Sequence, residues 1–100
     1  MSNSTSLLAY PDVKEALERA LATTKGVRVR FQDGSSAFRF VARCNSFRLL
    51  DRKENLKIYL EPAHSLHGRS VYDVLAIRRS EDNFVTIEPV RLEAGVMEDL

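Results

Sequence analysis

Residues Val27 to Lys57 read VRVRFQDGSSAFRFVARCNSFRLLDRKENLK, and the way they fold decides the architecture of the chain. At the start of this segment, Val27, Val29 and Phe31 alternate with arginines. Such alternation predicts a strand with one buried side and one side facing water.

The residues after this strand allow two continuations. In the first, Gln32–Ser36 forms a hairpin turn, and a second strand follows in which Phe38, Phe40 and Ala42 alternate. In the second, Ser35 or Ser36 caps a helix that runs to about Arg52. We favour the helix, because neither glycine nor proline interrupts residues 35–61.

The flanking segments supply a helix on one side and a hairpin on the other. Pro11 suits a helix start, and the spacing of Val13, Ala16, Leu17, Ala20 and Leu21 predicts a helix over 11–24, with Gly26 as its C-terminal cap. Leu56, Ile58 and Leu60 predict a brief extended segment, and residues 62–70 predict a loop. Residues 71–79 and 84–90 predict two strands joined by a turn at 82–83, with Pro89 near the strand end.

Together these elements predict a single α+β domain over residues 1–100. Its two layers would comprise an N-terminal helix, a strand, an arginine-rich helix and a C-terminal β-hairpin, with residues 1–6 and 92–100 frayed. The alternative is a small barrel of the Sm or SH3 kind with an N-terminal helix. One hundred residues bury one modest core, so we expect any site to be shallow or shared between subunits.

Composition narrows the class of protein. The single cysteine, Cys44, cannot form an internal disulfide, which favours a reducing compartment. No apolar run reaches the ~20 residues that span a bilayer, and the first residues lack the basic start of a signal peptide. We therefore expect a cytoplasmic protein without a membrane partner.

Charge is unevenly distributed along the chain. Residues 25–57 hold nine Lys/Arg against three Asp/Glu, although the whole protein has a net charge of only +1. A face of arginines can neutralise phosphates and stack on bases. We therefore predict contacts to nucleic acid or another anionic partner from seven residues: Arg28, Arg30, Arg39, Arg43, Arg48, Arg52 and Lys53. Exposed aromatic side chains such as Phe38 would add stacking.

The same charge separation supports an alternative function. A basic segment and an acidic C-terminal segment on one small domain suit docking to a host or phage protein, or assembly as a homo-oligomer. Pairing of the arginines with the chain's own carboxylates is the competing explanation of the pattern.

Residues suited to catalysis or metal binding are few. His64 and His67, near Glu61, form the sole candidate metal cluster, and their loop context favours no metal. Cys44 falls on an apolar face in either continuation, which predicts an inert buried thiol. Asp73 is expected to cap a turn or accept a bond from an arginine of the basic helix. We predict no cofactor, no catalytic residues and no enzymatic activity.

Two resemblances accompany these patterns. The arginine-rich run beginning Ala37-Phe38-Arg39, followed by the later Ser70-Val71-Tyr72-Asp73-x-Leu75, resembles small uncharacterised proteins of bacteriophages and their hosts, over about residues 27–88. That resemblance implies the helical continuation and a phage-related origin. VRVRFQDGSS with the later AIRRSEDNFVTIEP is similar to the Sm pattern, although Arg79 replaces its glycine and the Asp-x-x-x-Asn motif of its RNA-binding loop is missing.

Overall fold

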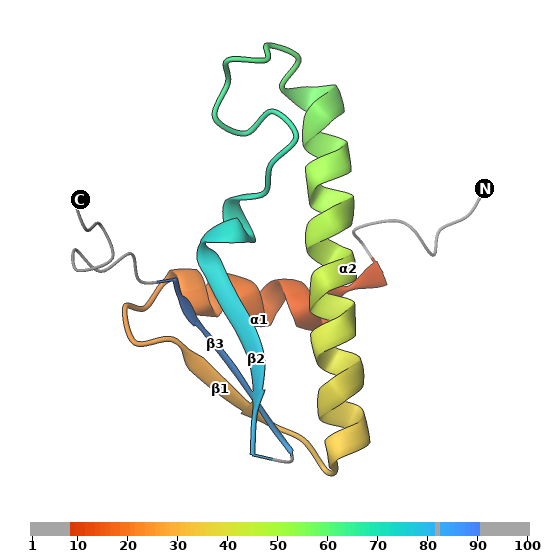
Figure 1. Ribbon diagram of the computed structural model, residues 1–100, viewed down its shortest axis with the longest axis vertical. Helices are drawn as coiled ribbons and strands as arrows, with labels where there is room; N and C mark the ends of the chain where they lie inside the picture. Colours follow the sequence, from red (N-terminus) through yellow and green to blue (C-terminus); the bar gives the residue numbers. More distant parts are fainter. Residues whose placement is uncertain (1–8, 82, 91–100) are drawn as a thin grey trace, which may run out of the picture.

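The computed structural model describes residues 9–81 and 83–90, and there the predicted α+β class is confirmed. The elements, in chain order, are α1 (Pro11–Leu21), β1 (Val27–Arg30), α2 (Gly34–Ile58), the 3-10 helix η3 (Val71–Val74), β2 (Leu75–Ser80) and β3 (Phe84–Pro89). β3 lies between β1 and β2 and pairs antiparallel with both. Figure 1 shows α2 standing beside this open sheet and α1 crossing behind it. The predicted frayed ends and turn residue Asp82 lie outside the described residues.

Residues 35–52 are helical, so the favoured continuation is confirmed and the second strand through Phe38–Ala42 is wrong. Asp33 caps the helix, because its side chain accepts the Ser36 N–H at 2.8 Å. The cap therefore precedes the two serines expected to provide it. α2 also runs past Arg52 to Ile58, so the extended segment predicted at Leu56–Leu60 is wrong over its first residues.

Two other predicted boundaries shift. α1 ends at Leu21 rather than at residue 24. Gly26 enters β1 with a φ of +87°, and a Cβ there would lie 2.6 Å from the Ile87 carbonyl oxygen. Glycine is needed at this position for the close approach to β3, not as a helix cap. The first four residues of the predicted strand 71–79 form η3 instead, because Ser70 and Asp73 make a capping box at its start.

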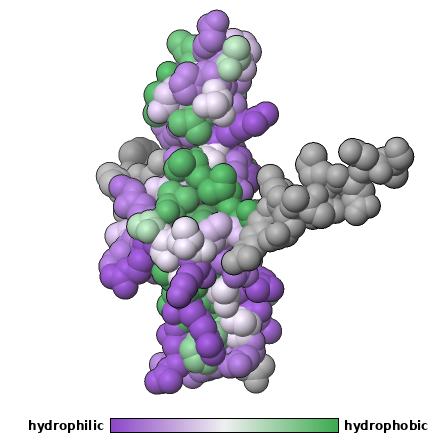
Figure 2. Space-filling model, turned by 90° about the vertical axis from the view of Figure 1, so that its left-hand side faces the viewer, coloured by the Kyte–Doolittle hydropathy of each residue, from purple (hydrophilic) through white to green (hydrophobic). Residues whose placement is uncertain are grey.

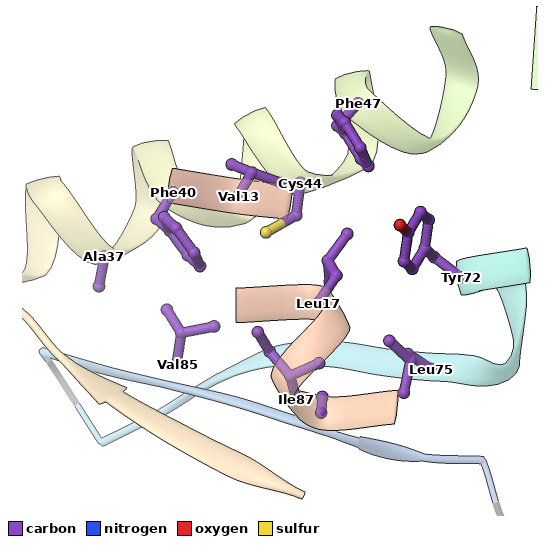
Figure 3. Packing of buried hydrophobic residues seen from close by; sticks show 11 residues of the cluster. Val13, Leu17, Ala37, Phe40, Cys44, Phe47, Tyr72, Leu75, Val85 and Ile87 are labelled. Atoms are coloured by element: carbon purple, nitrogen blue, oxygen red, sulfur yellow. The ribbon is translucent and has the colours of Figure 1, made fainter. Parts of the chain in front are cut away.

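Both helices bury their apolar sides against one face of the sheet. Figure 3 shows Phe40, Cys44 and Phe47 of α2 directed toward Leu17 of α1 and Ile87 of β3. Burial of such side chains contributes about 1.5–3 kcal/mol each, so this cluster is the main source of stability. The opposite face of the sheet has no helix over it among the described residues, and it includes Arg28, Arg30 and Arg78.

Candidate functional site

The structure does not gather the seven predicted contact residues on one face. Arg28 and Arg30 lie on β1, on the open side of the sheet. The other five lie on α2, on different sides of the helix: Arg39 and Arg43, Arg48 and Arg52, and the outward-facing Lys53. A single continuous arginine face is therefore not formed.

Arg43 connects α2 to α1. Its guanidinium donates to both carboxylate oxygens of Asp12, at 2.6 and 2.9 Å, and lies 5.4 Å from the centre of the Tyr10 ring. The hydrogen bond from Arg43 is the main cause that holds the pKa of Asp12 below its usual range. This bidentate geometry commits the arginine to an intramolecular contact.

Arg52 is committed in the same way to η3. It donates to Asp73 at 2.7 Å from Nη2 and at 3.1 Å from Nε, and the Ser70 N–H donates to the same carboxylate at 3.0 Å. Partial burial by itself would raise the pKa of Asp73, but these hydrogen bonds outweigh it and the net shift is downward. Both roles predicted for Asp73, turn cap and arginine acceptor, are therefore confirmed.

Arg48 has a structural role that the sequence did not indicate. Its Nη1 donates to the main-chain oxygens of Leu75, at 2.8 Å, and Tyr72, at 3.3 Å, and its Nη2 donates to Asn45 at 2.9 Å. Burial lowers the pKa of this guanidinium. Arg48 thus satisfies carbonyl groups where η3 passes into β2, and it is not free for a ligand.

The open face of the sheet carries Arg28, Arg30 and Arg78. Arg28 lies over the Phe84 ring at 3.9 Å and donates to Glu81 at 3.4 Å. Arg78 was not among the predicted residues, yet it is in register with Arg28 across β3 and pairs with Glu88 at 2.6 Å. Its place in the alternation of the hairpin strand was the signal that could have identified it.

The side of α2 that points away from the core exposes large apolar side chains. We call its four apolar residues the outer stripe; they are Phe38, Ala42, Leu49 and Leu56. Phe38 is 63% exposed, Leu49 is 49% exposed and Leu56 is 47% exposed. The 3.6-residue repeat of a helix places these residues opposite Phe40, Cys44 and Phe47, so α2 is apolar on two sides and only one of them is buried.

Cations border the outer stripe on one flank. These flanking cations are Arg39, Lys53 and Lys57, all exposed. The acids of α2 lie elsewhere: Asp51 accepts the Ser70 hydroxyl at 2.6 Å, and Glu54 lies on the far side of Lys57, at 3.7 Å from its Nζ. The outward side of α2 is therefore apolar and basic, with no carboxylate among its own residues.

A second apolar surface lies over η3 and the strand ends. Figure 2 shows hydrophobic surface at mid-height between two hydrophilic regions, on the side of the molecule where η3 lies. Val71, Val74 and Val90 are each about half exposed, and the Val90 N–H donates to the Val74 carbonyl at 2.8 Å.

Groups with reactive chemistry are used structurally. Cys44 is fully buried, as predicted, and burial raises the pKa of its thiol to about 12, which disfavours the reactive thiolate. His64 stacks on Tyr59 at 4.3 Å, and His67 Nδ1 lies 2.6 Å from the Tyr59 carbonyl oxygen. Within residues 9–81 and 83–90, no three His, Cys, Asp or Glu residues are grouped to hold a metal ion.

Comparison with known proteins adds no family to these observations. No protein-family model, curated protein or solved structure matches the chain. The resemblance to phage-encoded proteins therefore stays a prediction. Over the described residues, no helix is both long and apolar enough to cross a membrane.

Proposed function

We propose that this protein is a non-catalytic binding module and that the outward side of α2 is its docking surface for another protein. The observation that carries the proposal is the outer stripe. A small monomeric domain rarely leaves several large apolar side chains exposed along one helix unless they meet a partner. Phe38 is 63% exposed and Leu49 is 49% exposed, whereas the buried core residues are at most 7% exposed, and neither belongs to the hydrophobic core of the described residues.

The internal pairing of the arginines supports a protein partner over nucleic acid. Arg43 and Arg52 each hold a carboxylate with two hydrogen bonds, and Arg48 holds main-chain oxygens. An arginine in such a contact must give it up before it can neutralise a phosphate, and leaving the partner unpaired costs free energy. The anionic partner is thus better sought among proteins with acidic surfaces.

Nucleic-acid binding remains a second candidate on the open face of the sheet. The specific observation is that Arg28, Arg30 and Arg78 share this face beside Phe84. With two of the three paired to glutamates, binding would be weak and strongly dependent on salt. Anisotropy titrations of single-stranded DNA and RNA, with Arg30→Ala against the matched control Arg43→Ala, test it. Binding that is absent at low salt, or equal for both variants, excludes this face.

Position-specific photo-crosslinking tests the protein-binding proposal. A photoreactive phenylalanine analogue replaces Leu49 in one variant and the exposed Lys14 of α1 in another, and both are irradiated in the native cells. We expect a discrete protein adduct from position 49 that is absent from position 14 and is lost when Phe38→Asp is added. Equal adducts at both positions, or none at position 49, contradict the proposal. An adduct at position 49 that nuclease removes assigns the surface to nucleic acid instead.

A further inference from the structure

The outer stripe also indicates what kind of segment would bind there, an inference that rests on the proposed function. We infer that the partner segment is an acidic amphipathic α-helix that lies along α2.

The spacing is that of a helix–helix seam. The outward positions 38, 42, 45, 49, 52 and 56 follow one another at alternating steps of four and three residues. This is the heptad pattern in which the side chains of one helix insert between those of another. The pattern persists along most of α2, so the matching segment is a straight helix of about three heptads rather than a loop or a single anchoring side chain.

Two of the seam positions, 45 and 52, are polar, and each of these side chains makes a hydrogen bond within the protein. Arg52 is held toward Asp73 by its two-pronged contact, so its guanidinium is directed to η3 rather than outward between Leu49 and Leu56. Asn45 accepts a hydrogen bond from Arg48 at 2.9 Å, which fixes its side chain. A single asparagine in an apolar seam selects the register and the number of helices that can pair, at some cost in affinity.

The flanking cations select the charge of the partner. Arg39 and Lys53 occupy positions directly beside the seam, where coiled coils place the charges that determine partner choice, and Lys57 lies further out on the same flank. A helix with glutamates beside its apolar seam would meet these cations, and their attraction would speed association at low salt. A basic helix would be repelled.

The same charges argue against a second copy of this chain. If two α2 helices pack antiparallel, Arg39 of one lies near Lys53 and Lys57 of the other. If they pack parallel, Lys53 of one copy faces Arg48 of the other. Either arrangement places like charges together, and it is therefore less favourable than pairing with an acidic helix.

Two designed peptides of about three heptads test the inference. They share one leucine seam, and one has glutamate at every flanking position where the other has lysine. Fluorescence anisotropy measures their binding to the full chain at low and high salt. We expect the glutamate peptide to bind at low salt, the lysine peptide to bind at least about tenfold more weakly, and salt to reduce the difference.

Variants of the full chain locate the binding. Leu49→Gln is expected to weaken the glutamate peptide about tenfold, the loss expected for one buried leucine. Val74→Thr is the matched control, because Val74 is 55% exposed on another surface, and it should leave binding unchanged. Arg39→Ala combined with Lys53→Ala should remove most of the salt dependence. Circular dichroism of each variant verifies that the fold is retained.

Several results would overturn the inference. They are no binding of the glutamate peptide at low salt, equal binding of the lysine peptide, or equal losses from Leu49→Gln and Val74→Thr. A dimer in sedimentation that Leu49→Gln abolishes assigns the stripe to a second copy, and binding to phosphatidylserine vesicles that the same change abolishes assigns it to a membrane. The crosslink at position 49 is independent of the peptides, so the proposed function can stand if the acidic helix fails.

Discussion

The two sides of α2 are similar in sequence and opposite in their surroundings. On the inner side, Phe40 is 5% exposed and Phe47 is 2% exposed, while on the outer side Phe38 is 63% exposed. Helical spacing alone cannot show which side is buried, since each side has apolar residues at intervals of three and four. The sheet and α1 select one side as core, and the other is left as surface.

The inner side itself changes character along the helix. Up to Phe47 it is apolar and packs on the sheet, whereas beyond it Asp51 and Asn55 hold the chain through hydrogen bonds to Ser70 and to the Arg69 carbonyl. One half of α2 is thus fixed by burial and the other by polar contacts to the segment before η3. The outer stripe belongs to neither of these two sets of contacts, although Leu56 at its end lies close to Gly68 of the loop before η3.

Truncating an inner phenylalanine should have the largest effect on stability. Phe40→Ala removes a ring that contacts Phe31 at a centroid distance of 5.0 Å and leaves a cavity, so we expect a loss of about 3–5 kcal/mol. Phe38→Ala, which removes a ring on the opposite side of the same helix, should change the free energy of unfolding by less than about 0.5 kcal/mol. Urea denaturation followed by circular dichroism measures both. Similar losses from the two variants would refute the assignment of inner and outer sides.

Thiol reactivity gives a second contrast between the sides. Cys44 is inside the core, and burial raises the pKa of its thiol to about 12, so the native protein should react with Ellman's reagent at least about 100-fold more slowly than the unfolded chain. In Cys44→Ala/Leu49→Cys, the outward thiol should react nearly as fast as a free one. A fast native Cys44 would mean that the inner side opens readily.

The sequence predicted the helices and strands of this fold better than it predicted the residues at which they begin and end. The alternation at Val27–Phe31 was sufficient to predict β1. The absence of glycine and proline after Ser35 was sufficient to favour a helix over a second strand. The helix end was misplaced because the alternation of Leu56, Ile58 and Leu60 suits a strand as well, and because the contacts that hold Asn55 come from a segment fourteen residues away.

The site could be predicted only in part, for a related reason. Sequence shows how many arginines a segment holds, but not which carboxylate each one meets. Asp12 lies 31 residues from Arg43, and Asp73 lies 21 residues from Arg52, so these pairs exist only once the fold brings them together. Phe38 was expected to be exposed, and it is, but the stripe it belongs to was hidden by the equally apolar inner side.

The Arg52–Asp73 pair should give the polar half of α2 a dependence on pH. Because the pKa of Asp73 is lowered in the folded state, the pair adds stability that is complete above the pKa of the unfolded carboxyl, about 3.9, and is lost as the pH falls through the folded value. Arg52→Ala should cost about 1 kcal/mol near neutral pH and less in acid. Urea midpoints from pH 7 down to pH 3 measure this.

A control separates this pair from general acid denaturation. Arg43→Ala removes the other two-pronged pair, whose carboxylate is more exposed (53% for Asp12 against 31% for Asp73), so we expect a smaller loss than from Arg52→Ala. If Arg52→Ala costs the same amount at pH 3 as at pH 7, the ion pair does not contribute as the geometry indicates.

Leu49→Gln should have the smallest effect on stability, and that small effect is what distinguishes a docking surface from a core. Leucine and glutamine have similar helix propensities, and residue 49 is half exposed, so the free energy of unfolding should change by less than about 0.5 kcal/mol. Urea denaturation provides the measurement. A loss above about 1 kcal/mol would show that the fold itself uses the outer stripe. In that case the two sides of α2 would not differ as proposed, and the partner helix would have no free surface to bind.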